Sequence, residues 1–499
     1  MSSEPRIQPA GGAGRDDGAG PSDAGAGILN RPYRWVTVGM LAMILLAAFE
    51  ALAVTTVMPT ISRELHGGSL YALAFSGPLA VGVVGMVVAG NWSDRSGPRR
   101  PIFAAVFSFA GGLLLAGLAT DMPLLVLGRL ISGLGGGGLT VALYVLVARV
   151  FPERLHTKVF AAFAAAWVIP SLVGPLIAGV VAQTVGWRWV FLGVVVLVLL
   201  AMFMVVPVMR QFAEKPGDAG ASAPIVPWKV SRIVWSVVVA FAVLAASLAG
   251  EVSGALVWVL SGVAVVVAIV ALRPLLPVGA LRSAAGLPTV IALRGLMSGA
   301  YFATETYLPY FFTSQYGLTP ALAGLALSVS GLSWAGASWV QGRYSARISD
   351  VASFRVGIVL VLAAVASALG CSVLGLPPAI AITGWVFAGA GMGAMYPRLS
   401  VATLRLSTPA NQGFNSSALA ISDSTGAALA LAITAAVFAT LGGGSAGAAA
   451  SGSGAPVDVL AFTGCFVVSV VLGLFSLAVA GRAEPRLRHA DAVDVSGSL

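Results

Sequence analysis

The segment Gly90-Asn-Trp-Ser-Asp94-Arg95-Ser-Gly97-Pro98-Arg99-Arg100 decides how this chain is interpreted, because it is a short charged loop between two long apolar runs. The run before it covers residues 72–92 and the run after it covers residues 101–120. An apolar run of about 20 residues is long enough to cross a bilayer as a helix. Two such runs joined by a charged loop predict a helical hairpin whose turn lies on one side of a membrane.

The composition of the whole chain supports this interpretation. Of its 499 residues, 58% are hydrophobic and 9% are charged, whereas soluble chains carry about 25% charged residues. A soluble enzyme, a secreted disulfide scaffold and a disordered protein are therefore excluded. The net charge of +9 lies in small basic groups between the apolar runs, which is the pattern of a membrane protein. We expect the lipid bilayer as a partner and no nucleic acid.

Apolar runs recur along the chain and predict an all-α membrane protein with fourteen transmembrane helices. Two sets of six runs flank an extra hairpin at 232–272, which only Arg232 and Glu251 interrupt. The runs lie near residues 35–58, 72–92, 101–120, 122–148, 160–183, 189–209, 232–250, 253–272, 287–312, 319–341, 354–374, 378–397, 414–440 and 458–480.

The basic residues predict the orientation of these helices. A cytoplasmic N-terminus places all of the 28 lysines and arginines except Arg63, Arg129 and Arg188 on the cytoplasmic side, and positive charge favours that side. We therefore expect a multi-pass protein of the cell membrane with both termini in the cytoplasm. The expected parts are a disordered tail (1–34), a six-helix bundle (35–209), a cytoplasmic linker (210–231), the extra hairpin (232–272), a second six-helix bundle (273–481) and a tail (482–499).

Four ionisable residues are predicted to lie well inside the apolar runs: Glu50, Arg129, Glu305 and Asp423. A charge at this depth is costly, so each one is a functional hypothesis. Glu50 and Arg129 lie at similar depth, which makes an ion pair possible. Such a pair either takes part in proton or substrate handling or fixes two helices structurally.

Glu305 lies in an aromatic stretch with Tyr301, Tyr307 and Tyr310. A carboxyl group there can exchange a proton or attract a cation whose rings stack on the aromatic side chains. The alternative is a protonated side chain that bonds a neighbouring helix. Asp423 lies within four consecutive polar residues, 422–425, which predict a packed or water-lined stretch and either a substrate contact or a polar helix contact.

No cofactor, metal or ATP site is predicted. Gly133, Gly135 and Gly138 spell a dinucleotide-binding pattern, but inside an apolar run this pattern favours close helix packing. None of the three lysines follows a glycine, and the three histidines lie far apart. A phosphate-binding loop and a metal site are thus disfavoured, and we expect no enzymatic activity.

The quoted loop resembles the signature G-x-L-A-D-R-x-G-R-K of the major facilitator superfamily, with Pro98 in place of a basic residue. The resemblance implies a conformational gate that closes the cytoplasmic side. In this gate the Asp94 carboxylate pairs with basic groups or with a helix N-terminus across the bundle. The gate residues are Gly90, Asp94, Arg95, Gly97, Arg99 and Arg100.

Three further motifs carry the resemblance. The segment Leu125-x-x-x-Arg129-x-x-Ser132-Gly133 is similar to the family's helix-4 motif, whose arginine is implicated in proton coupling. Glu50, nine residues before Pro59, resembles the acidic residue in the helix-1 motif of fourteen-helix drug:proton antiporters. In helix 5, Pro170-x-x-x-Gly174-Pro175-x-x-Ala178-Gly179 resembles the antiporter signature G-x-x-x-G-P-x-x-G-G, with Pro170 and Ala178 in place of two of its glycines.

The resemblance implies a fourteen-helix major facilitator fold that works by alternating access and exports small amphipathic compounds, neutral or cationic, such as drugs. The partners are then a small-molecule substrate and protons, and we expect a monomer. Glu50, Arg129 and Glu305 are expected to couple protons, and Glu305, Asp423 and the three tyrosines to bind substrate. Two alternatives are a metabolite or siderophore transporter of the same fold and a non-transporting membrane sensor.

Overall fold

The computed structural model describes residues 27–31, 33–65, 71–211, 228–249, 256–318, 320–443 and 458–484. Most of the predicted N-terminal tail, linker and C-terminal tail lies outside the described residues, as does the predicted turn around Glu251.

Each predicted apolar run coincides with a helix, and no strand is found in the described ranges. The first six helices are α1 (Arg34–Glu64), α2 (Tyr71–Ser96), α3 (Arg99–Gly117), α4 (Met122–Val150), α5 (Glu153–Thr184) and α6 (Arg188–Gln211). The extra hairpin consists of α7 (Val230–Ala249) and α8 (Leu256–Leu272). The later helices are α9 (Leu287–Tyr316), α10 (Pro320–Arg343), α11 (Asp350–Leu374), α12 (Pro378–Arg405), α13 (Gln412–Phe438) and α15 (Val459–Ala480).

Eight of the described helices are long and apolar enough to cross a membrane. Helices α7 and α8 are apolar but contribute shorter apolar segments. Helix α9 is fully described and long, but Arg294, Glu305 and its tyrosines keep it below this level of hydropathy. The chain is thus an all-helical membrane protein, and the arrangement of fourteen spans stays a prediction.

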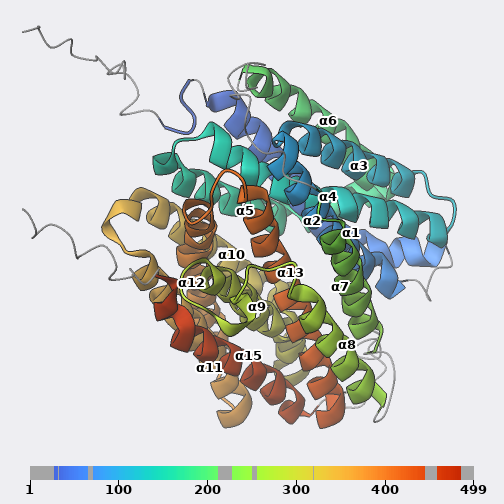
Figure 1. Ribbon diagram of the computed structural model, residues 1–499. Helices are drawn as coiled ribbons and strands as arrows, with labels where there is room; N and C mark the ends of the chain where they lie inside the picture. Colours follow the sequence, from blue (N-terminus) through green and yellow to red (C-terminus); the bar gives the residue numbers. More distant parts are fainter. Residues whose placement is uncertain are drawn as a thin grey trace, which may run out of the picture.

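The buried side chains form two large hydrophobic clusters, one built mainly from α1 and α3 to α6 and the other from α9 to α15. Helices α7 and α8 pack alongside both groups (Figure 1). They share a third buried cluster with α2 and α13, which includes Val87, Val239, Leu272 and Leu419. The hairpin therefore contacts both parts of the molecule.

The glycines of α4 let its neighbours approach closely. A Cβ atom on Gly133 would overlap the backbone of Pro78 in α2, and one on Gly135 would overlap the backbone of Phe109 in α3. The prediction that this glycine pattern serves helix packing is confirmed. A similar close approach joins α2 to α13, where a Cβ on Gly90 would overlap the backbone of Gly413.

Candidate functional site

Glu50 and Arg129 form a buried ion pair between α1 and α4. The guanidinium of Arg129 bonds the Glu50 carboxylate, and the two side chains are only 7% and 8% exposed. The Nε atom of Arg129 also donates to the carbonyl of Ala74 in α2, at 3.3 Å. Since each charge has its counter-charge, the pair can persist in a site shielded from water.

The helix-5 motif lies next to this pair. Helix α5 continues through Pro170 and Pro175, and Gly174 faces the ring of Phe49, the residue before Glu50. A Cβ atom added at Gly174 would lie 3.6 Å from that ring, an ordinary van der Waals contact, so the two positions are close. The antiporter motif and the acidic residue of helix 1 are thus neighbours in space.

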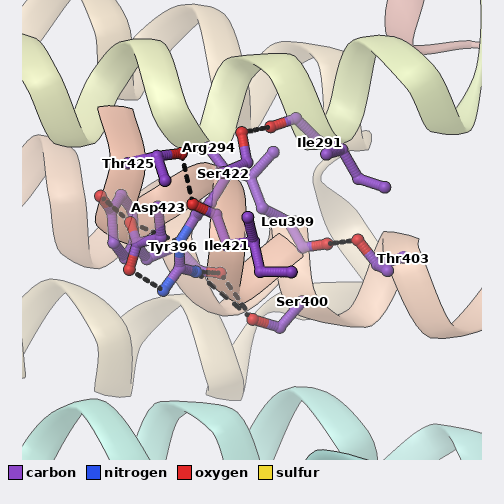
Figure 2. Close-up of polar contacts among 10 residues, drawn as sticks. All are labelled: Ile291, Arg294, Tyr396, Leu399, Ser400, Thr403, Ile421, Ser422, Asp423 and Thr425. Atoms are coloured by element: carbon purple, nitrogen blue, oxygen red, sulfur yellow. Dashed lines mark hydrogen bonds and ion pairs between the residues drawn. The ribbon is translucent and has the colours of Figure 1, made fainter. Parts of the chain in front are cut away.

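A second charged cluster joins α9, α12 and α13. Figure 2 shows Arg294, Asp423 and Tyr396 pointing toward one another. The Nε atom of Arg294 lies 3.0 Å from Oδ1 of Asp423, and its Nη2 donates to Oδ2 at 3.2 Å. The Tyr396 hydroxyl donates to Oδ1 at 2.9 Å, and the guanidinium lies 3.7 Å over the Tyr396 ring. Both charges are therefore paired and oriented by an aromatic ring.

Sequence reasoning missed the role of Arg294. It counted this residue among the cytoplasmic basic residues, whereas the structure places it inside α9 at 8% exposure. A signal was available, because Arg294 lies as many residues inside the run 287–312 as Arg129 lies inside the run 122–148. The depth criterion that singled out Arg129 therefore applies to Arg294 as well.

Glu305 lies on α9, one turn beyond Tyr301. The Tyr301 hydroxyl donates a hydrogen bond to Oε1 of Glu305 at 3.2 Å. The same hydroxyl lies 2.8 Å from the hydroxyl of Ser330 in α10. None of the ion pairs in the part of the chain that the structure describes includes Glu305. The carboxyl group is half-buried with a phenol as its partner, not a cation.

Aromatic rings connect Glu305 with the Asp423 cluster. Tyr301 contacts Trp334 edge-on, with ring centroids 5.4 Å apart, and Trp334 contacts Tyr396 at 5.2 Å. Tyr396 in turn bonds Asp423. Eleven residues of α9 separate Arg294 from Glu305, about 16 Å along the helix axis. The two groups are therefore distant along α9 but joined through side chains of α10 and α12.

Tyr307 and Tyr310 lie elsewhere. Their rings pack on Phe438 of α13 at 5.0 and 5.8 Å, and the Tyr310 ring also contacts Phe462 of α15 at 5.4 Å. Among the sequence-predicted substrate residues, the structure thus brings Tyr301 to Glu305. It places Tyr307 and Tyr310 in a separate aromatic cluster.

The predicted gate residue Asp94 contacts the N-terminus of α13. Its two carboxylate oxygens accept hydrogen bonds from the backbone N–H groups of Gly413, at 2.5 Å, and Phe414, at 2.8 Å. The positive end of the helix dipole favours this arrangement. Burial raises the pKa of Asp94 to about 6, although these donors and the charges of Arg149 and Arg232 lower it.

The other gate residues surround this contact. Gly90 packs on Gly413, and Gly97 takes the positive φ of 75° that the turn after α2 requires. Arg95, Arg99 and Arg100 are exposed. We call this end of the molecule, where α2 ends and α13 begins, the gate end. In this structure the Asp94 contact joins α2 to α13 at the gate end.

In the described ranges no group of three or more metal-ligating side chains lies together.

The chain was compared with known proteins. The MFS-type transporter ppz2 of Metarhizium majus is 26% identical over 359 residues, which are 68% of this chain and 60% of that protein. This chain thus spans less than two thirds of that relative. The multidrug efflux pump SdrM of Staphylococcus aureus is 23% identical over 381 residues, 74% of this chain and 82% of that protein. The fold resembles the human organic anion transporter MFSD10 (TETRAN), with a TM-score of 0.66 at 14% identity over 90% of this chain and all of that one.

A family model decides the assignment. The model described as Major Facilitator Superfamily matches residues 40–431, which is more than half of the chain and includes both charged clusters and the gate end. The chain therefore belongs to the Major Facilitator Superfamily.

Proposed function

We propose that this transporter exports small amphipathic compounds, neutral or cationic, in exchange for protons, and that Glu305 carries the exchange. The observation that carries the proposal is the carboxyl group of Glu305 in the middle of α9, which bonds the Tyr301 hydroxyl and forms no ion pair within the described residues. A half-buried carboxylate without a cationic partner is costly inside a membrane, so it favours a bound proton or a bound cation.

The charge balance within the helices supports Glu305 over the other candidates. Glu50 is neutralised by Arg129, and Asp423 is neutralised by Arg294. Ionised Glu305 then leaves one negative charge in excess. A proton or a cationic substrate removes this excess, whereas an anionic substrate would add to it. Although Arg294 adds a second arginine at depth, its pairing with Asp423 leaves the preference for neutral or cationic compounds unchanged.

Competition at one carboxyl group produces antiport. If a proton and a substrate cannot occupy Glu305 together, each is released only when the other binds. The ring of Tyr301, whose hydroxyl bonds Glu305, contacts the rings of Trp334 and Trp385, and aromatic rings suit a flat cation by stacking and cation–π attraction. Alternating access would expose Glu305 to either side of the membrane in turn, with the Asp94 contact closing one side.

The finer architecture belongs to the same proposal. It comprises fourteen spans in two six-helix bundles with an extra hairpin, both termini in the cytoplasm, and residence in the cell membrane. The similarity to SdrM, which is named a multidrug efflux pump, is consistent with this function.

The test uses the full chain in liposomes with an imposed pH gradient and a pH-sensitive dye inside. Tetraphenylphosphonium and ethidium serve as probes. We expect each to evoke proton flux that is lost in Glu305→Gln and kept in the matched control Glu153→Gln, whose carboxyl group is exposed at the start of α5. Flux that survives Glu305→Gln would refute the role of Glu305. Folded wild-type protein that gives no flux with either probe would refute cationic drug export.

A further inference from the structure

A small cavity lies between α2, α7 and α13, one turn before Asp94 along α2. Its volume of about 10 Å³ has room for one water molecule, or for one oxygen atom of a larger group that reaches in from outside. The lining residues are Val87, Asn91, Arg232, Leu275, Phe414 and Ser417.

The polar lining consists mainly of hydrogen-bond donors. Asn91 is 7% exposed, and its Nδ2 group is buried without a partner among the described residues. Arg232 lies flat over the Phe414 ring, at 3.6 Å, and forms no ion pair within the described ranges. The Ser417 hydroxyl completes the set. Asp94 lies near enough to act on Arg232 electrostatically, but both of its oxygens accept bonds from α13.

This donor set favours an anion. A buried amide N–H without an acceptor is destabilising, and a guanidinium beside it binds phosphate oxygens strongly. A neutral water molecule would satisfy the amide but would add no negative charge beside Arg232, which among the described residues has only Asp94 nearby, a carboxylate already bonded to α13. An oxygen atom with negative charge satisfies both.

Neighbouring residues indicate where the anion comes from. The rings of Trp92 and Trp228 lie 6.4 Å apart, and Trp228 is 39% exposed. Trp92 directly follows the cavity-lining Asn91, and Trp228 lies four residues before Arg232. Lys229 is exposed beside it. Tryptophan and basic residues at the end of membrane helices mark the level of lipid headgroups.

We propose that the cavity binds one phosphate oxygen of a phospholipid whose headgroup carries a net negative charge, because the quaternary ammonium of a zwitterionic headgroup would offset the attraction to Arg232 and Lys229. The donors come from α2, from α13 and from the extra hairpin, so the complete site exists only while α2 and α13 are in contact. A ligand that binds one of two conformations shifts the equilibrium toward it. The bound phosphate therefore holds the gate end closed, and the extra hairpin supplies its cationic ligand. This inference does not depend on the proposed substrate or on proton coupling.

The test measures the gate directly. Spin labels are placed at Ser96→Cys, which is exposed at the end of α2, and at Ala410→Cys, which is exposed just before α13. The native Cys371 and Cys465 are buried and do not interfere. Distances between the labels are measured by double electron–electron resonance in nanodiscs of phosphatidylcholine, with and without added phosphatidylglycerol. Inorganic phosphate is added to the phosphatidylcholine discs in a separate arm.

We expect phosphatidylglycerol to raise the closed-to-open ratio by roughly tenfold or more, the effect of one charge-assisted hydrogen bond. This response should be lost in Arg232→Gln, weakened in Asn91→Leu, and kept in the control Arg282→Gln, whose side chain is exposed outside the cavity. Each variant is compared with itself without phosphatidylglycerol, and a label distribution like that of the wild type in those discs shows that it folds.

Three results would overturn the proposal or part of it. If Arg232→Gln responds to phosphatidylglycerol as the wild type does, the site is not at this cavity. If neither phosphatidylglycerol nor inorganic phosphate changes the distribution, no phosphate site controls the gate. If inorganic phosphate alone produces the full shift, the cavity binds phosphate but the lipid source is wrong.

Discussion

Removing one partner of the Glu50–Arg129 pair is expected to destabilise the protein far more than removing both. Both side chains are more than nine-tenths buried. Glu50→Gln therefore leaves the Arg129 charge buried without a counter-charge, which costs about 3–5 kcal/mol. This loss lowers the folded-to-unfolded ratio by roughly 10² to 10⁴. The double variant Glu50→Gln with Arg129→Gln removes both charges, and we expect it to recover about 2–3 kcal/mol of that loss.

The assay is reversible unfolding in mixed micelles, titrated with a denaturing detergent and followed by tryptophan fluorescence. The chain supplies a matched control in Glu64 and Arg188, which pair at 3.1 Å with side chains 48% and 41% exposed. An exposed pair contributes only about 0–1 kcal/mol. A coupling energy for Glu50–Arg129 no larger than that of the exposed pair would show that burial does not strengthen this interaction. The structural reasoning about this site would then fail.

Three further predictions concern the second charged cluster and the gate. In the same unfolding assay Asp423→Ala should destabilise more than Tyr396→Phe, because the first change leaves Arg294 unpaired and the second removes one hydrogen bond of about 1–3 kcal/mol; equal losses would contradict the assigned ion pair. Gly90→Val should speed maleimide labelling of Ser417→Cys, a buried position, since the added side chain would overlap Gly413 and Ser417 and separate α2 from α13; an unchanged rate would argue against that close contact. The contact with α13 holds Asp94 at a pKa of about 6, above its ordinary 3.8, so the contact is favoured at low pH and weakens as the pH rises through 6. Because maleimide reacts with the thiolate, the labelling rate of Ser417→Cys is divided at each pH by that of the exposed position Ser96→Cys; this ratio should be higher above pH 6 than at low pH, and Asp94→Asn should abolish the difference.

The candidate site was predictable only in part. Glu50, Arg129, Glu305 and Asp423 could be found from the sequence because a charge inside an apolar run is conspicuous wherever it lies. The partners of these residues are harder to predict from the sequence. The equal depth of Glu50 and Arg129 indicated one pair, but Arg294 and Asp423 lie 129 residues apart, and nothing in the spacing joins them.

Four of the tyrosine and glutamate positions of α9 illustrate the same limit. In sequence Tyr301, Glu305, Tyr307 and Tyr310 form one aromatic stretch. In the structure Tyr301 and Glu305 share a face, since residues four apart on a helix are neighbours, while Tyr307 and Tyr310 face α13 and α15. Helical spacing gives the relative faces, but only the packed neighbours decide which face meets the charged clusters.

The sequence by itself determined the helices and their apolar character, because hydrophobic run length and turn residues act locally along the chain. It also indicated four of the charges that lie inside the helices, although Arg294 was not among them. The tertiary structure alone decided how those charges are paired, that Asp94 meets the N-terminus of α13, and that Arg232 of the extra hairpin reaches the same contact. These features depend on the rotation and crossing of helices far apart in the chain, and these are set by side-chain packing between helices.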